Sequence, residues 1–294
     1  MARRITLAFF MPDEVLIMAL RIGQIDYANC TPLFTALINH FDCTNYQFIR
    51  GVPAKLNAML CRGEIDLCPS SSFEYGKSSE KYYLLPGLSI SSIGAVKSVL
   101  LFSRLPIDSL DNQPIGLTTE SDTSVNLLKI ILAKGYGYAN VFQRTSLTLH
   151  EALNSFGAIL LIGDTALKER IRSQGLYIYD LGEMWQELTG LPFVFALWIV
   201  TREAAETKGE EVKSLASRLL EAKNLAYGMY EEIAAGCEGM EWIGCEMLAD
   251  YWRTISYDLT PQHVAGVRRF FSMAKELGLL PADPELRFFP GFSD

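Results

Sequence analysis

The sequence predicts an α/β protein made of two lobes, and three observations support this fold class. Short apolar segments alternate with helical patterns from residue 19 to about 200, which is typical of a largely parallel sheet with crossover helices. Two strong apolar strands, at 97–104 and 193–201, divide this region into two series of strands and helices. From residue 203 onward nearly all of the chain has a helical pattern, so we expect a helical C-terminal tail packed on lobe one.

The first series is framed by prolines and a glycine that mark the ends of its helices. Pro32 and Pro53 suit the first position of a helix, because their fixed φ and missing N–H cost nothing there. Gly63 then ends the second of these helices. The series consists of strands near 20–27, 46–50 and 65–68 and of helices near 32–41 and 53–62.

The second series follows a polar turn through Asn112 and Pro114. It consists of strands near 115–117, 139–143, 158–162 and 176–180 and of helices near 121–134, 149–155 and 164–173. The tail is predicted to form helices near 203–233, 239–254 and 262–277. Because we expect the chain to cross between the lobes in its two strong strands, lobe one should comprise residues 1–103 and 202–294 and lobe two residues 104–201, with 1–17 as an extension outside the core.

Composition and charge exclude several classes of function. The chain of 294 residues is 49% hydrophobic and 20% charged, which is ordinary for a globular enzyme. Its formal net charge of −8 argues against nucleic acid or an anionic membrane as the main partner. A protein of this charge that binds anions must hold them locally, with N–H groups and hydroxyls.

Other simple patterns predict neither a metal nor a cofactor. The six cysteines include no Cys-x-x-Cys pair and only three histidines are present, so free thiols and no metal ligands are expected. Gly135 and Gly137 follow a helix and do not form a dinucleotide fingerprint, and no phosphate-binding loop is found. Pro12 interrupts the first apolar run and no later run approaches the length of a membrane span, so we expect a cytoplasmic protein.

Four segments place small polar side chains where a strand ends and a helix starts. In α/β proteins ligands bind beyond the carboxyl ends of the strands, where the N–H groups of a first helical turn favour anions. We therefore predict one crevice for a carboxylate. The residues expected to form it are Asn29 and Thr31, Ser70 and Ser71, Thr123 and Ser124, and Gly163 and Asp164.

Several of these residues also have a purely structural interpretation. Ser71 and Glu74 fit a capping box, which leaves Ser70 freer to face a ligand. Asp164 fits a helix N-cap, while Gly163 would let a ligand approach the backbone closely. Cys30 has no His neighbour in the sequence, so we do not expect it to act as a nucleophile.

Longer motifs run through both series. They are Ile22-Gly23-x-Ile25-x-Tyr27-x-Asn29-x-x-Pro32-Leu33, Gly63-Glu64-Ile65-Asp66-Leu67, Phe73-Glu74-Tyr75, Ser98-Val99-Leu100-Leu101-Phe102-Ser103, Leu161-Ile162-Gly163-Asp164-x-Ala166-Leu167 and Asp180-Leu181-Gly182-x-x-Trp185-x-x-Leu188-Thr189-Gly190-Leu191-Pro192-Phe193-Val194-Phe195-Ala196-Leu197-Trp198. In these motifs the chain resembles the chorismate dehydratase family of the futalosine route of menaquinone biosynthesis. The resemblance covers about residues 19–202 and is weaker in the helical tail.

The resemblance implies a fold like that of type II periplasmic binding proteins, with the ligand in the cleft between two lobes. It implies a carbon–oxygen lyase that removes water from chorismate to give 3-[(1-carboxyvinyl)oxy]benzoate. The partner would be this small dicarboxylate, with no nucleic acid and no membrane, and the oligomeric state is left open. On this basis Asn29 is the expected catalytic residue and Ser98 lines the hinge, while the other polar residues of the crevice bind the substrate carboxylates.

Two alternatives and three further candidate residues stay open at this stage. A related enzyme that cleaves a cyclic futalosine derivative shares the fold, but it resembles this chain less because its first strand–helix turn carries a His in place of Asn29. A non-catalytic binding protein for small carboxylates would have the same fold, although such proteins usually work outside the cytoplasm. The motif segments offer no convincing His or Lys base, so Asp26, Tyr27 and Asp164 are reserve candidates for an acid or base.

Overall fold

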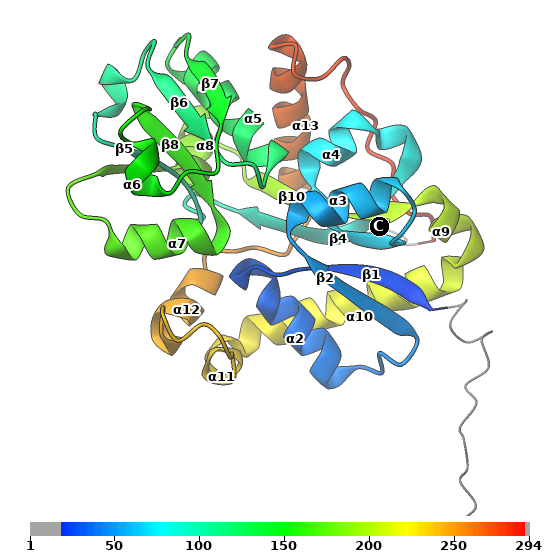
Figure 1. The fold of residues 1–294 in the computed structure, drawn as a ribbon. Coiled ribbons are helices and arrows are strands. Elements are labelled where there is room, and N and C mark those ends of the chain that lie inside the picture. The colour runs from blue at the N-terminus through cyan, green and yellow to red at the C-terminus, as the bar shows by residue number, and fades with distance from the viewer. Residues whose placement is uncertain (1–18, 292–294) are drawn as a thin grey trace, which may run out of the picture.

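The protein consists of two α/β lobes, each built on its own five-stranded sheet (Figure 1). This architecture comes from a computed structural model that describes residues 19–291, so the expected extension at 1–17 lies outside the described residues. The prediction of a two-lobed α/β fold is confirmed, because the strands divide into two sheets rather than forming one continuous sheet.

The sheet of lobe one has the strand order β2-β1-β3-β10-β4. Strand β1 pairs in parallel with β2 and β3, as crossover helices between them require. Strand β10 comes from a distant part of the sequence and runs antiparallel to both β3 and β4. These strands span Leu20–Ile25 (β1), Tyr46–Gly51 (β2), Leu67–Ser71 (β3), Tyr82–Ser92 (β4) and Phe193–Thr201 (β10).

The sheet of lobe two repeats this arrangement with the order β7-β6-β8-β5-β9. Strand β6 pairs in parallel with β7 and β8, and β5 runs antiparallel to β8 and β9. The strands span Val99–Ser103 (β5), Pro114–Leu117 (β6), Val141–Arg144 (β7), Ala158–Ile162 (β8) and Tyr177–Asp180 (β9).

The two strong strands belong to the opposite lobes from those expected. Val99–Ser103 pairs in the sheet of lobe two, and Phe193–Thr201 pairs in the sheet of lobe one. The chain therefore passes between the sheets in 93–98 and 181–192, before and after the second sheet. The apolar composition of a strand does not reveal which of the two sheets it joins, because a fully buried strand fits either sheet equally well and only its pairing partners differ. We propose lobe boundaries that follow the two sheets, near residues 92–99 and 180–193.

Strand β4 is absent from the sequence prediction, and its composition explains why. Pro86 and Gly87 interrupt the apolar pattern of the strand, and the serines at 89, 91 and 92 replace the apolar residues that usually indicate a buried strand. Ser89 and Ser91 are nevertheless fully buried, because their hydroxyls donate to the carbonyl oxygens of Asp258 and Ser256 in the tail. The tail thus forms an isolated antiparallel β-bridge with this strand, between Ser256 and Ser91.

Most of the remaining elements follow the expected positions, but the helix expected near 239–254 begins only at Cys245, and the sequence indicates α4 only by its polar start. The helix expected near 203–233 is three helices, α9, α10 and α11, which are separated at Lys208 and Met229. Helix α8 is additional to the prediction. The helices are α2 (Thr31–His40), α3 (Pro53–Cys61), α4 (Ser72–Lys77), α5 (Asp122–Ile130), α6 (Leu149–Ala152), α7 (Gly163–Arg172), α8 (Leu181–Thr189), α9 (Arg202–Thr207), α10 (Gly209–Gly228), α11 (Tyr230–Ala235), α12 (Cys245–Trp252) and α13 (Pro261–Glu276).

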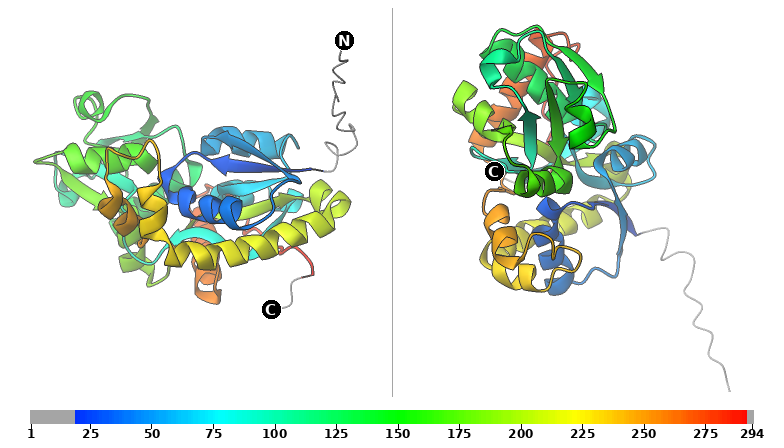
Figure 2. Two further views of the ribbon diagram at one scale, coloured as in Figure 1. Left: turned by 90° about the horizontal axis from the view of Figure 1, so that it is seen from below. Right: turned by 60° about the vertical axis from the view of Figure 1, so that its left-hand side comes forward.

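The helical tail packs mainly on lobe one, as expected. Helix α10 lies beside α2 below strand β1, and α11 and α12 continue along the same side (Figures 1 and 2). Helix α13 also contacts α5, so the tail reaches lobe two as well. Within residues 19–291, none of the helices combines the length and apolar character needed to cross a membrane.

Candidate functional site

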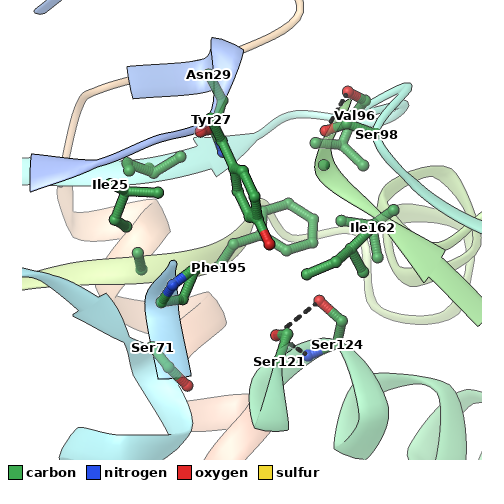
Figure 3. A pocket seen from close by; sticks show the side chains of 15 residues that line it. Ile25, Tyr27, Asn29, Ser71, Val96, Ser98, Ser121, Ser124, Ile162 and Phe195 are labelled. Atoms are coloured by element: carbon green, nitrogen blue, oxygen red, sulfur yellow. Dashed lines mark hydrogen bonds between the residues drawn. The ribbon is translucent and has the colours of Figure 1, made fainter. Parts of the chain in front are cut away.

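A pocket lies between the two lobes, where the ends of several strands meet (Figure 3). It contains about 580 Å³ of space not filled by atoms, part of it continuous with solvent, which suits a small ligand. Five of the nine predicted site residues line it, namely Asn29, Ser71, Ser98, Ser124 and Gly163. None of the described side chains that line the pocket is charged, and its apolar walls come from Ile25, Ile90, Val96, Val99, Ile162 and Phe195.

Asn29 reaches the pocket from a single 3₁₀ turn, Ala28–Cys30, that follows strand β1. The turn leads directly into helix α2, whose first residues include Pro32, as the sequence indicates. The side-chain Oδ1 of Asn29 is buried and has no hydrogen-bond partner among the described residues. A buried amide oxygen without a partner is costly, so a bound ligand that donates a hydrogen bond there would be stabilised.

Tyr27 extends into the pocket from lobe one (Figure 3). Its ring lies close to Gly163 of lobe two, since a Cβ built on that glycine would be 3.1 Å from the ring. Burial raises the pKa of this phenol far above its ordinary value, and the nearby Glu120 carboxylate raises it further. The hydroxyl therefore keeps its proton at neutral pH and is a hydrogen-bond donor rather than a base. Of the three reserve candidates, Tyr27 is the one that lines the pocket.

Ser70 and Ser71 point in opposite directions, because successive side chains of a strand alternate between its faces. Ser71 lines the pocket, whereas the Ser70 hydroxyl donates to Asn57 Oδ1 on α3 at 2.7 Å. The expected capping box is wrong, since Ser71 caps no helix N–H with its side chain. Its hydroxyl is instead 2.6 Å from Thr123 Oγ1, a contact that joins the two lobes.

Helix α5 presents its N-terminus to the pocket from lobe two. Ser121 caps the helix by accepting from the Ser124 N–H at 3.1 Å, and both hydroxyls line the pocket. Ser121 is missing from the sequence prediction, although it belongs to the polar run that pointed to this helix start. Thr123 is turned away from the pocket, because its Oγ1 accepts from the Phe73 N–H at 3.0 Å as well as contacting Ser71.

Ser98 and Gly163 meet where the chain enters lobe two. The Gly163 N–H donates to the Ser98 carbonyl oxygen at 2.7 Å, so this amide already has a partner within the protein. The segment before Ser98 is held by Asp180, whose carboxylate accepts from the N–H groups of Val96 and Lys97 at 3.0 and 2.7 Å. Asp180 also caps α8, which accounts for its place in the longest sequence motif.

Thr31 and Asp164 lie near the pocket without lining it. Thr31 lines a second hollow, on lobe one, together with Asp26 and Arg50. Asp164 does not cap its own helix; its Oδ1 accepts from the Ala28 N–H at 3.1 Å, which links α7 of lobe two to the turn that carries Asn29. Burial raises the pKa of the Asp164 carboxyl, although the Ala28 N–H opposes this effect.

This shift in pKa gives a testable pH dependence. We expect Asp164→Asn to keep the acceptor for Ala28 while removing the buried charge. Because the pKa is higher in the folded protein than in the unfolded chain, the wild type should gain stability relative to the variant as the pH falls through the raised pKa toward about 4. The gain would be about 1.4 kcal/mol for each pH unit by which the pKa is raised.

Urea unfolding of both proteins at several pH values between neutral and about 4 measures this difference. Asp26→Asn, which removes an exposed carboxylate, is the matched control. A constant difference between wild type and Asp164→Asn at all pH values would contradict the expectation.

The described residues offer the pocket neither a metal centre nor a reactive thiol. Residues 19–291 contain no group of three or more His, Cys, Asp or Glu side chains that could hold a metal ion. Burial raises the pKa of Cys30 far above its ordinary value, so this thiol stays protonated. The polar groups that line the pocket are serine hydroxyls, the Asn29 amide and the Tyr27 phenol.

Comparisons with known proteins place this chain in a family. The sequence matches the family model for menaquinone biosynthesis over residues 20–276. It is 32% identical to the chorismate dehydratase of Thermus thermophilus, over 88% of this chain and 95% of that protein. It is 33% identical to the chorismate dehydratase of Campylobacter jejuni, over 62% of this chain and 68% of that protein.

Solved structures support the fold independently of sequence identity. A protein of Archaeoglobus fulgidus superposes with a TM-score of 0.71 at 19% identity and covers 90% of this chain and 99% of its own. The periplasmic aliphatic sulphonate binding protein of Escherichia coli superposes with a TM-score of 0.68 at 14% identity, covering 92% and 97%. The expected fold of periplasmic binding proteins is thus confirmed, and the match over most of the sequence shows that this chain belongs to the menaquinone-biosynthesis family.

Proposed function

We propose that this protein is a chorismate dehydratase, a hydro-lyase that converts chorismate into 3-[(1-carboxyvinyl)oxy]benzoate. The observation that carries the proposal is an uncharged interlobe pocket lined by Asn29 and serine hydroxyls, in a chain 32% identical to a chorismate dehydratase over 95% of that relative. Chorismate has two carboxylates and a ring hydroxyl, and these groups match a pocket of hydroxyl and amide groups between apolar walls.

The reaction removes the hydrogen at ring carbon C3 and the hydroxyl at C4. The electrons of the C3–H bond form the new ring π bond while the C4–O bond breaks, and the departing hydroxide and the proton leave as water. The product ring is aromatic, so the step is strongly downhill. The protein has mainly to hold one conformer of the substrate so that this elimination outruns rearrangement or loss of pyruvate.

The proton acceptor in this proposal is the enolpyruvyl carboxylate of the substrate itself. Of the pocket side chains only Tyr27 is titratable, and its raised pKa makes it a donor. Asn29 would orient the enolpyruvyl group or assist the departing hydroxyl. The hydroxyls of Ser71, Ser98, Ser121 and Ser124 would bind the carboxylates, since hydrogen bonds to a charged acceptor are the stronger ones.

The direct test is to incubate the purified full-length protein with chorismate and to separate the products by chromatography with mass spectrometry. We expect a product lighter than chorismate by one water, formed in proportion to protein concentration and absent from samples without protein or with heat-unfolded protein. Unchanged chorismate after incubation with folded protein would contradict the proposal.

Mass spectrometry also distinguishes the dehydratase from the two alternative functions. A non-catalytic carboxylate-binding protein would release an intact small carboxylate on denaturation and leave chorismate unchanged. The related enzyme would consume a cyclic futalosine derivative instead. Asn29 in the first strand–helix turn favours the dehydratase over that relative, and the cytoplasmic location expected from the sequence stays a prediction.

A further inference from the structure

We infer that three aromatic residues of the C-terminal tail are positioning residues for the site. They are Tyr251, Trp252 and Tyr257, and from outside the pocket they donate hydrogen bonds to Ser98 and to the turn that carries Asn29. The inference rests on the proposed function and deepens it by assigning a role to the helical tail. None of the three residues lines the pocket, and they stand more than 150 positions from their partners in the sequence.

The turn that carries Asn29 receives two of these hydrogen bonds. Trp252 Nε1 donates to the Ala28 carbonyl oxygen at 2.7 Å, and the Tyr257 hydroxyl donates to the Asn29 carbonyl oxygen at 2.8 Å. Both aromatic side chains are fully buried. A turn of three residues has few hydrogen bonds of its own, so these two donors restrict the backbone from which the Asn29 side chain enters the pocket.

The third hydrogen bond concerns Ser98. The Tyr251 hydroxyl donates to Ser98 Oγ at 2.9 Å, and burial keeps this phenol protonated by raising its pKa far above the ordinary value. A hydroxyl that accepts one hydrogen bond still has its own proton to donate. Its nearest described acceptor is the Val96 carbonyl at 3.5 Å, which is a weak bond, so the proton is available to a substrate carboxylate.

The tail can position these groups because its own backbone is fixed by contacts with neighbouring elements. The Tyr257 ring stacks on Tyr227 with ring centres 5.8 Å apart, and the Tyr227 hydroxyl accepts from the Tyr257 N–H at 2.8 Å. Residues Ser256 and Ser91 exchange both backbone hydrogen bonds at 2.8 Å, which fixes the segment to strand β4. The three donors are thus attached to the sheet of lobe one rather than to a free loop.

Three single variants test the inference, each deleting one donor. Tyr257→Phe and Tyr251→Phe remove only a hydroxyl, whereas Trp252→Phe also removes part of a fully buried ring system. In Tyr257→Phe and Trp252→Phe we expect kcat for water loss from chorismate to fall roughly tenfold, with KM changed much less. Tyr75→Phe is the matched control for Tyr257→Phe, because Tyr75 is also fully buried and its hydroxyl donates to the backbone carbonyl of Glu285 at 2.8 Å, away from the pocket. The control should lose stability similarly while keeping kcat.

The role of Tyr251 is tested by a double-mutant cycle with Ser98. We expect Tyr251→Phe to lower kcat/KM roughly fivefold in the wild type and to have almost no effect in Ser98→Ala, because Tyr251 acts through that hydroxyl. Equal effects of Tyr251→Phe in both backgrounds would overturn this part of the inference. A decrease in kcat for Tyr75→Phe as large as for Tyr257→Phe would overturn the part that concerns the Asn29 turn.

Hydrogen exchange separates this inference from the proposed function. In Trp252→Phe and Tyr257→Phe the amides of residues 27–31 should exchange faster than in the wild type, whereas Tyr75→Phe should leave them unchanged. If the wild type did not dehydrate chorismate, the proposed function would fail, yet the exchange rates would still decide whether the tail holds the turn. Unchanged exchange in both tail variants would overturn the inference whatever the activity.

Discussion

Asn29→Ala should lower kcat for water loss from chorismate by roughly 100- to 1000-fold, the range for removing one polar group that stabilises a developing charge. The side chain is the amide that projects into the pocket from the turn after β1, and its Oδ1 has no partner among the described residues. In the proposed reaction the Nδ2 group of Asn29 donates to the departing C4 hydroxyl, and a hydrogen bond that strengthens as negative charge develops lowers the barrier more than it tightens substrate binding. We therefore expect KM to change far less than kcat.

The matched control for this variant is Asn57→Ala. Asn57 is also an asparagine of lobe one, but it lies on α3 and its Oδ1 accepts from Ser70, and neither residue lines the interlobe pocket. Its loss leaves the buried Ser70 hydroxyl without its acceptor and should lower stability, but kcat should stay within about threefold of the wild type because neither residue lines the pocket. Near-normal turnover of Asn29→Ala, together with an inactive Asp26→Ala or Asp164→Ala, would contradict the mechanism and assign the chemistry to a carboxylate.

Gly163→Ala should reduce kcat/KM by roughly 100-fold, because it displaces a side chain that crosses the pocket. Gly163 has a φ of +59°, and a Cβ built there would lie 3.1 Å from Cε2 of the Tyr27 ring. The ring belongs to lobe one and the glycine to lobe two, so an added methyl group would push the two lobes apart at the site. Steady-state kinetics with chorismate measures the loss.

Gly175→Ala separates the steric effect from the cost of the backbone conformation. Gly175 lies in the loop after the same helix, α7, with a φ of +70° and nothing within 4 Å of a built Cβ. Both variants should lose roughly 1–2 kcal/mol of stability from the left-handed conformation. Only Gly163→Ala should lose activity. Equal activities of the two variants would show that close contact between Tyr27 and Gly163 is not needed for turnover.

Part of the site could be predicted from the sequence, because it depends on patterns of residues that are close together in the chain. Strand ends followed by small polar residues and a helix start predict a crevice for anions, and Asn29, Ser71 and Ser124 do face one pocket. Which side chains of each segment face the pocket was harder to predict. Ser70 and Thr123 face away from the pocket, since strand alternation and a hydrogen bond across the lobes decide their direction. Ser121 was missed, although it lies in the same polar run.

What the sequence by itself determined is the two-lobed α/β class, most helix and strand positions in residues 19–180, and the family resemblance carried by its motifs. These features depend on periodicity and on residues close together in the chain. Only the tertiary structure decided which sheet β5 and β10 join, and that the buried serines of β4 bind the tail. It also decided that the hydroxyl of Tyr257, 228 residues away, donates to the Asn29 carbonyl oxygen. Such contacts depend on long-range packing, for which local periodicity carries no signal.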